Sequence, residues 1–163
     1  MMGPRDKREG RDAQVDAWND DGAPSGRGRT RVLHLGVHVV EREEPDTCVV
    51  RFGGDLEERD VALILDAFEE FAGVRERAYL LIDLRGLGRA TAEARRLAGM
   101  RQLPPQYAGL SLFGGSFEQQ LVAKLATMAG WLLRGRSLGK PMPVCVKREG
   151  EARAWVAAQR GRR

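Results

Sequence analysis

Apolar and polar positions divide the chain near residue 31. Residues 1–31 hold many Gly, Asp and Arg residues, few large apolar side chains and no periodic pattern. Such a segment cannot bury enough apolar surface to offset the entropy lost on ordering, so we predict a disordered tail. From residue 32 to 160, apolar residues recur with the periods of strands and helices, which predicts one domain. Residues 161–163 form a short basic tail.

Five short apolar runs in the domain predict β-strands. They are residues 37–41, 48–52, 78–83, 110–113 and 142–146. The clearest is residues 78–83, where five apolar residues lead into Asp83, as in a buried central strand. Pro45-Asp46 separates the first two runs and is a turn signal, so we expect a hairpin there.

Apolar residues spaced three and four apart predict four helices. The first follows Asp55, which we expect to cap it, and the others cover about residues 91–102, 116–133 and 149–159. The resulting order is β-β-α-β-α-β-α-β-α. Alternating strands and helices favour right-handed crossovers, so we predict an α/β fold with a mixed five-stranded sheet and helices on its faces.

Composition narrows the functional classes. The 27 basic and 23 acidic residues of this 163-residue chain nearly balance, so we expect no nucleic-acid partner. No apolar run approaches 18 residues, and the first residues lack the apolar core of a secretory signal, so we expect a cytoplasmic protein. Cys48 and Cys145 lie in strand-like runs and read as buried thiols.

Several segments, taken in order, resemble the SpoIIAA-like family of STAS/SEC14-type domains. They are residues 52–56, 81–87, 93–96, 113–117 and 151–156. The resemblance implies a bacterial, non-catalytic module, since relatives act as anti-sigma-factor antagonists, as regulatory domains of transporters, or as binders of lipids and small ligands. Some relatives are thought to associate with membranes. The antagonists carry a phosphorylated serine in an Asp-Ser motif, which is missing here, and only Thr91 lies near the equivalent place.

Candidate binding residues follow the predicted strands. Asp83, with Arg85 behind it, ends a buried strand at the edge where α/β sheets bind ligands, although such a carboxylate also bonds the amides of its own loop. Thr91 suits a helix cap or, alternatively, a phosphorylation site. Gly114 and Ser116 frame a turn whose amides could face an anion; without the lysine of a P-loop, a turn with a serine cap is the favoured interpretation.

The helix predicted over 116–133 is apolar on nearly all sides. Its main stripe includes Leu121, Leu125 and Met128, and a helix of this kind is usually buried, although part of it could face a partner, a ligand cavity or a bilayer. One aromatic residue and three basic residues near the end of this helix would suit an anionic membrane surface. They are Trp131, Arg134, Arg136 and Lys140.

The sequence gives little support for catalysis or metal binding. His34 and His38 are the only histidines, and we place both on one strand face, with no carboxylate or thiolate near in sequence to complete a metal site. We therefore expect no enzyme, metal or cofactor. We expect a regulatory domain that binds a protein partner or an amphipathic ligand or lipid. It would act in the cytoplasm or at the inner membrane surface, and a homodimer is one alternative for its oligomeric state. The alternative is an anti-sigma-factor antagonist that switches through phosphorylation of Thr91.

Overall fold

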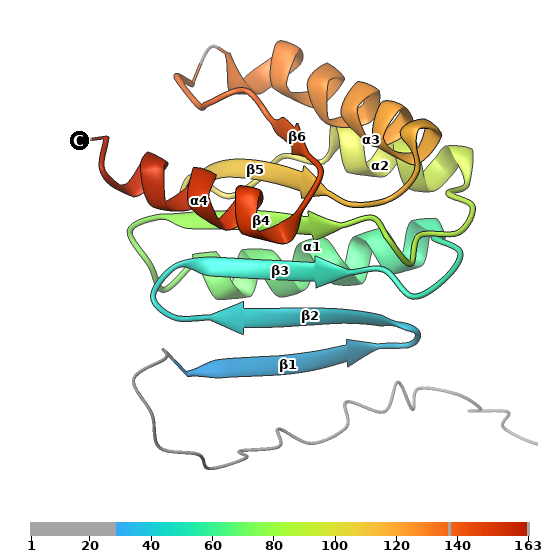
Figure 1. Cartoon of the computed structure of the whole chain (residues 1–163), viewed down its shortest axis with the longest axis horizontal. Helices are drawn as coiled ribbons and strands as arrows, with labels where there is room; N and C mark the ends of the chain where they lie inside the picture. The colour runs from blue at the N-terminus through green and yellow to red at the C-terminus, as the bar shows by residue number, and fades with distance from the viewer. Residues whose placement is uncertain (1–28, 137, 163) are drawn as a thin grey trace, which may run out of the picture.

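A six-stranded mixed sheet organises the domain (Figure 1). The computed structural model describes residues 29–136 and 138–162. The strands lie side by side in sequence order, with the first two pairs antiparallel and the last three parallel. They are β1 (Thr30–Leu35), β2 (His38–Glu43), β3 (Thr47–Arg51), β4 (Ala78–Asp83), β5 (Tyr107–Phe113) and β6 (Val144–Val146).

The described part of the chain has one strand more than the five predicted. The extra strand is β1, an edge strand with mostly exposed side chains, which explains its weak apolar pattern. Thr30 and Arg31, which we assigned to the tail, belong to it, while the rest of the predicted tail up to residue 28 lies outside the described residues. The mixed α/β class itself is confirmed.

The histidine prediction was wrong. A turn with Gly36 at φ 62° separates β1 from β2, so His34 and His38 lie on different strands. His34 pairs with Val39, the neighbour of His38, which puts the two imidazoles on opposite faces of the sheet.

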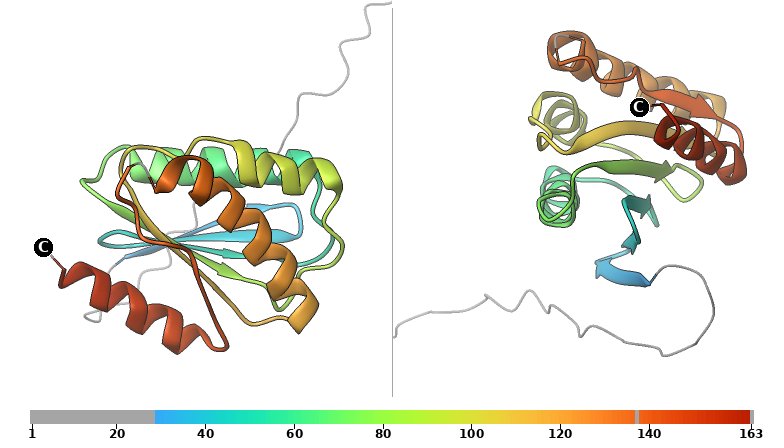
Figure 2. Two further views of the ribbon diagram at one scale, coloured as in Figure 1. Left: turned by 90° about the horizontal axis from the view of Figure 1, so that it is seen from above. Right: turned by 90° about the vertical axis from the view of Figure 1, so that its left-hand side faces the viewer.

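Helices cover both faces of the sheet (Figure 2). On one face lie α1 (Glu58–Ala72) and α2 (Ala92–Met100), and on the other lies α4 (Glu149–Arg160). Phe68 and Phe71 of α1 fill the larger core, while Ala152 and Val156 of α4 pack on Tyr79, Leu81 and Phe113. The remaining helix, α3 (Phe117–Gly130), continues into a π-helical turn, η1 (Trp131–Gly135), and lies beside α2 at the β5–β6 end of the sheet.

The cap of α1 also differs from the prediction. Glu57, not Asp55, is the N-cap residue, and it exchanges hydrogen bonds with Asp60 in a capping box. The Asp55 carboxylate instead accepts the backbone N–H of Arg89 at 2.7 Å, so it fixes the loop between β4 and α2.

None of the helices in the described ranges is both long enough and apolar enough to cross a bilayer.

Candidate functional site

Asp83 ends β4 as predicted and faces two arginines, Arg51 and Arg85. Its carboxylate accepts the backbone N–H of Arg85 at 3.0 Å and the Arg85 guanidinium at 2.6 Å, and Arg51 of the neighbouring strand donates at 3.1 Å. The side chain is only 7% exposed. Asp83 and Arg85 are therefore brought together, with the carboxylate bound to its own loop and to β3.

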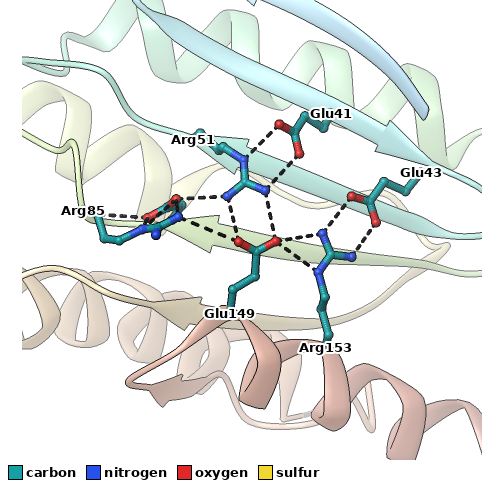
Figure 3. A network of polar contacts seen from close by, with 7 residues as sticks. Glu41, Glu43, Arg51, Arg85, Glu149 and Arg153 are labelled. Carbon is teal, nitrogen blue, oxygen red and sulfur yellow. Dashed lines mark hydrogen bonds and ion pairs between the residues drawn. The ribbon is translucent and has the colours of Figure 1, made fainter.

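An alternating chain of charges extends from this pair to α4 (Figure 3). Arg51 binds Glu41 of β2 and Glu149 of α4, each with two hydrogen bonds of 2.9–3.1 Å. Arg153, one turn along α4, donates to Glu149 and to Glu43 of β2. Bidentate pairing of this kind is geometrically specific, so the network fixes α4 over the middle of the sheet.

The network lowers the pKa of two of its carboxyl groups, Glu149 and Asp83. Hydrogen bonds from Arg51, and then those from Arg153, lower the pKa of Glu149 from 4.5 to about 2. Burial alone would raise the pKa of Asp83, but hydrogen bonds from Arg85 and Arg51 outweigh it, so that pKa lies below its usual value. A general acid or base needs a pKa near the working pH, and these two groups move in the opposite direction, which suits a structural clamp.

A polar cavity lies beside this clamp, between β2, β3 and the second half of α4. It measures about 610 Å³ and is lined by charged side chains that already have partners. Arg153 binds Glu43, and Arg160 binds Asp46 and Thr47. These pairs leave the cavity without the converging polar groups of a ligand site among its described lining residues.

Gly114 and Ser116 form the tight turn from β5 into α3. Gly114 and Gly115 have φ of 71° and 75°, which favours glycine, and a side chain at Gly114 would collide with Arg85. Ser116 accepts the N–H of Gln119 at 3.2 Å while Gln119 accepts the N–H of Ser116 at 2.7 Å. This reciprocal capping box satisfies the first amides of the helix and supports the interpretation as a capped turn.

Thr91 lies at the start of α2, where its hydroxyl accepts the N–H of Ala94 at 3.1 Å. The cap expected from the sequence is therefore present. The side chain is exposed.

The predicted stripe of α3 does not face the core. Leu121 and Leu125 are 45% and 62% exposed, and no residue of α3 is fully buried. The inner side carries small residues instead: a Cβ at Gly130 would lie 2.8 Å from the carbonyl oxygen of Gly99 in α2, and one at Gly99 would lie 3.2 Å from that of Ala126. The two helices thus approach through small residues, which leaves the large side chains outside.

Met128 and Trp131 are half-buried. The indole N–H of Trp131 donates to the carbonyl oxygen of Lys140 at 2.9 Å, which ties the π-helical turn to the segment that leads to β6. A π-helical turn inside a helix often marks a functional position.

An open groove of about 620 Å³ lies between the end of α2, the loop after it, and the second half of α3. Its walls are largely apolar. They include Leu103, Pro104, Tyr107, Leu110, Trp131, Leu133 and Leu138. The volume falls within the range of small-molecule sites, which are typically apolar with a few polar groups.

The charged residues of the groove are all basic. They are Arg101, Arg134 and Lys140, and no Asp or Glu is among the described lining residues. Arg101 is largely neutralised, because it binds Asp66 and Glu69 of α1. The ammonium of Lys140 donates to the carbonyl oxygen of Pro105 at 3.0 Å, and it has two further protons to donate. The groove therefore combines a largely apolar lining with charges of positive sign only.

The other candidate reactive side chains, His38 and Cys48, are buried in the domain. His38 is buried, accepts the N–H of Gly53 through Nδ1 at 3.3 Å and donates through Nε2 to the carbonyl oxygen of Asp55 at 3.1 Å. Burial raises the pKa of the Cys48 thiol to about 12. Among the described residues no three histidine, cysteine or carboxylate side chains gather as a metal site would require.

Two groups of residues escaped the sequence analysis. Arg51 and Glu149 are central to the charge network, and a signal for Arg51 existed: a lone arginine in the apolar run 48–52, next to the strand that ends in Asp83. The groove lining from residues 101–110 carried no such signal, since prolines and leucines after a helix are also typical of a plain connection.

Comparisons with known proteins yield little. No family model matches the chain, and no curated protein matches it significantly. Among solved structures, the chain is similar to an uncharacterized protein of the DUF3478 family with a SpoIIAA-like fold from Shewanella loihica PV-4. The identity is 18%, the TM-score is 0.43, and the match covers 82% of this chain and 98% of that one.

Proposed function

We propose that this domain is a non-catalytic binding module that takes an anionic amphiphile in the groove between α2 and α3. The observation that carries the proposal is the combination of a mostly apolar groove of about 620 Å³ with lining charges of one sign. An apolar chain would lie against Leu103, Leu110 and Trp131, and its acidic head would lie near Lys140.

Charge supports an acidic head. Between residues 119 and 148 the chain has six basic residues and no Asp or Glu, so α3 after its first turn and the segment that follows contribute no competing carboxylate. A charge-assisted hydrogen bond from Lys140 contributes about 1.5–3 kcal/mol. The groove should therefore prefer an anion over a neutral molecule of equal chain length by about tenfold.

Titration with decanoate and with 1-decanol tests this, followed by calorimetry or by tryptophan fluorescence. We expect decanoate to bind more tightly. Lys140→Gln should weaken decanoate binding about tenfold and leave decanol binding nearly unchanged, because it removes only the charge near the head.

Lys147→Gln is the matched control, since Lys147 is exposed and lies outside the groove lining. Absence of binding by both probes would refute the proposal. Equal loss in both lysine variants would show a general charge effect and would also refute the assigned head position.

A further inference from the structure

The outward side of α3 and η1 exposes an apolar surface that no described part of the chain covers. We call it the outer face, and its side chains are 39–79% exposed. It consists of Phe117, Leu121, Val122, Leu125, Leu132 and Leu133. The most exposed are Phe117 at 79% and Leu133 at 72%.

This face is unusual for a helix next to water. A surface helix normally turns its large apolar residues toward the core, whereas α3 packs on α2 through Gly130 and Ala126. Of the thirteen large hydrophobic residues that are exposed in the described structure, eight lie between Phe117 and Met142. Contiguous exposed patches of this kind mark interaction surfaces.

We infer that the outer face pairs with the outer face of a second copy of this chain, with the two α3 helices antiparallel about a two-fold axis near Leu125. A two-fold interface must be self-complementary, and the apolar residues extend on both sides of Leu125. The 19 residues from Phe117 to Gly135 span about 28 Å, long enough for a helix-pair contact.

The end charges match the antiparallel arrangement. Glu118 lies in the first turn of α3, and Arg136 follows η1 at the other end. Both are exposed. Antiparallel pairing brings Glu118 of each copy toward Arg136 of the other, and it also opposes the two helix dipoles favourably.

A second copy fits better than a bilayer. The exposed charges of α3 itself are Glu118 and Lys124, which balance, and the excess positive charge, Arg134 and Arg136, is confined to the far end at η1, so most of the outer face has no positive charge to attract anionic lipid. Moreover, a bilayer would desolvate Glu118 without offering a cation, which is costly.

Sedimentation equilibrium of the full-length chain tests the inference. At about 100 μM, where even weak dimers are detected, we expect a dimer. Leu125→Glu should produce a monomer with an unchanged circular dichroism spectrum, since Leu125 is 62% exposed and its replacement removes no core contact. Val74→Glu is the matched control, because Val74 is 83% exposed in the turn after α1 and should leave the dimer intact.

Charge reversal tests the direction of the helices. Glu118→Arg and Arg136→Glu should each weaken the dimer, and the double variant should restore it. A monomeric wild-type chain would overturn the inference, and binding of that monomer to phosphatidylglycerol vesicles would assign the outer face to a membrane instead. A dimer that survives Leu125→Glu, or that the double variant fails to restore, would refute the proposed pairing.

Discussion

Replacing Glu149 by glutamine tests the clamp between α4 and the sheet. The carboxylate binds Arg51 with two hydrogen bonds and Arg153 with two more. These bonds lower the pKa of Glu149 from 4.5 to about 2. A shift of that size corresponds to roughly 3 kcal/mol of stability at neutral pH. Because the glutamine amide keeps part of the hydrogen bonding, we expect Glu149→Gln to lower the free energy of unfolding by about 2 kcal/mol at pH 7.

The stabilisation by Glu149 should depend on pH in a definite direction. A carboxyl group whose pKa is lowered by folding stabilises the protein fully above its unfolded pKa, and this stabilisation is lost as the pH falls toward the folded pKa. The difference between the wild type and Glu149→Gln should therefore be largest at pH 7 and should shrink by about half or more at pH 3.

Urea unfolding at pH 7 and pH 3 measures both differences. Glu76→Gln serves as the control, since Glu76 is exposed and far from the clamp in the fold, and it should change stability by less than about 0.5 kcal/mol. A loss in Glu149→Gln that is no larger than in this control would refute the clamp. A loss that is equal at both pH values would show that the effect is not electrostatic.

Two further predictions concern single residues. Thr91→Ala should lower the free energy of unfolding by about 1 kcal/mol in urea melts, because it removes the acceptor for the N–H of Ala94. Thr91→Asp should retain most of the stability, since aspartate can also cap the helix. Equal losses in both variants would contradict the capping role. In the native protein, a thiol reagent at pH 8 should modify Cys145 before Cys48, because Cys48 is buried and its pKa is raised to about 12. Faster labelling of Cys48 would contradict its place in the core.

Much of the fold could be predicted because central elements have strong patterns. Residues 78–83 form β4 with the predicted bounds, since an uninterrupted apolar run ended by an aspartate suits a strand buried on both faces. The edge strand β1 escaped prediction because one face and its outer edge meet solvent, so burial imposes few apolar positions.

The orientation of α3 could not be predicted from its own residues. A helix that is apolar on nearly all sides has no polar side to show which way it faces. The side that packs is selected by small residues on two helices, Gly130 and Gly99, which are 31 positions apart in the chain. The groove depends on that same contact, since Gly99 and Gly130 are among its lining residues.

The ion pairs of the charge network were not predicted. The sequence indicated only that Asp83 bonds the amides of its own loop, as it does with the N–H of Arg85. Glu149 lies 98 positions from Arg51, and their contact depends on how α4 returns over the sheet. Sequence patterns reveal partners that are close in the chain, whereas partners that only the fold brings together leave no pattern.

Hydrogen exchange of the full-length chain, measured by mass spectrometry with and without decanoate, tests the binding groove most directly. We predict slower exchange in residues 98–105 and 127–134, which form the two walls of the groove, and no change in β1 and β2. Unchanged exchange in both walls, or protection confined to the loops at residues 83–91 and 114–116, would contradict the account.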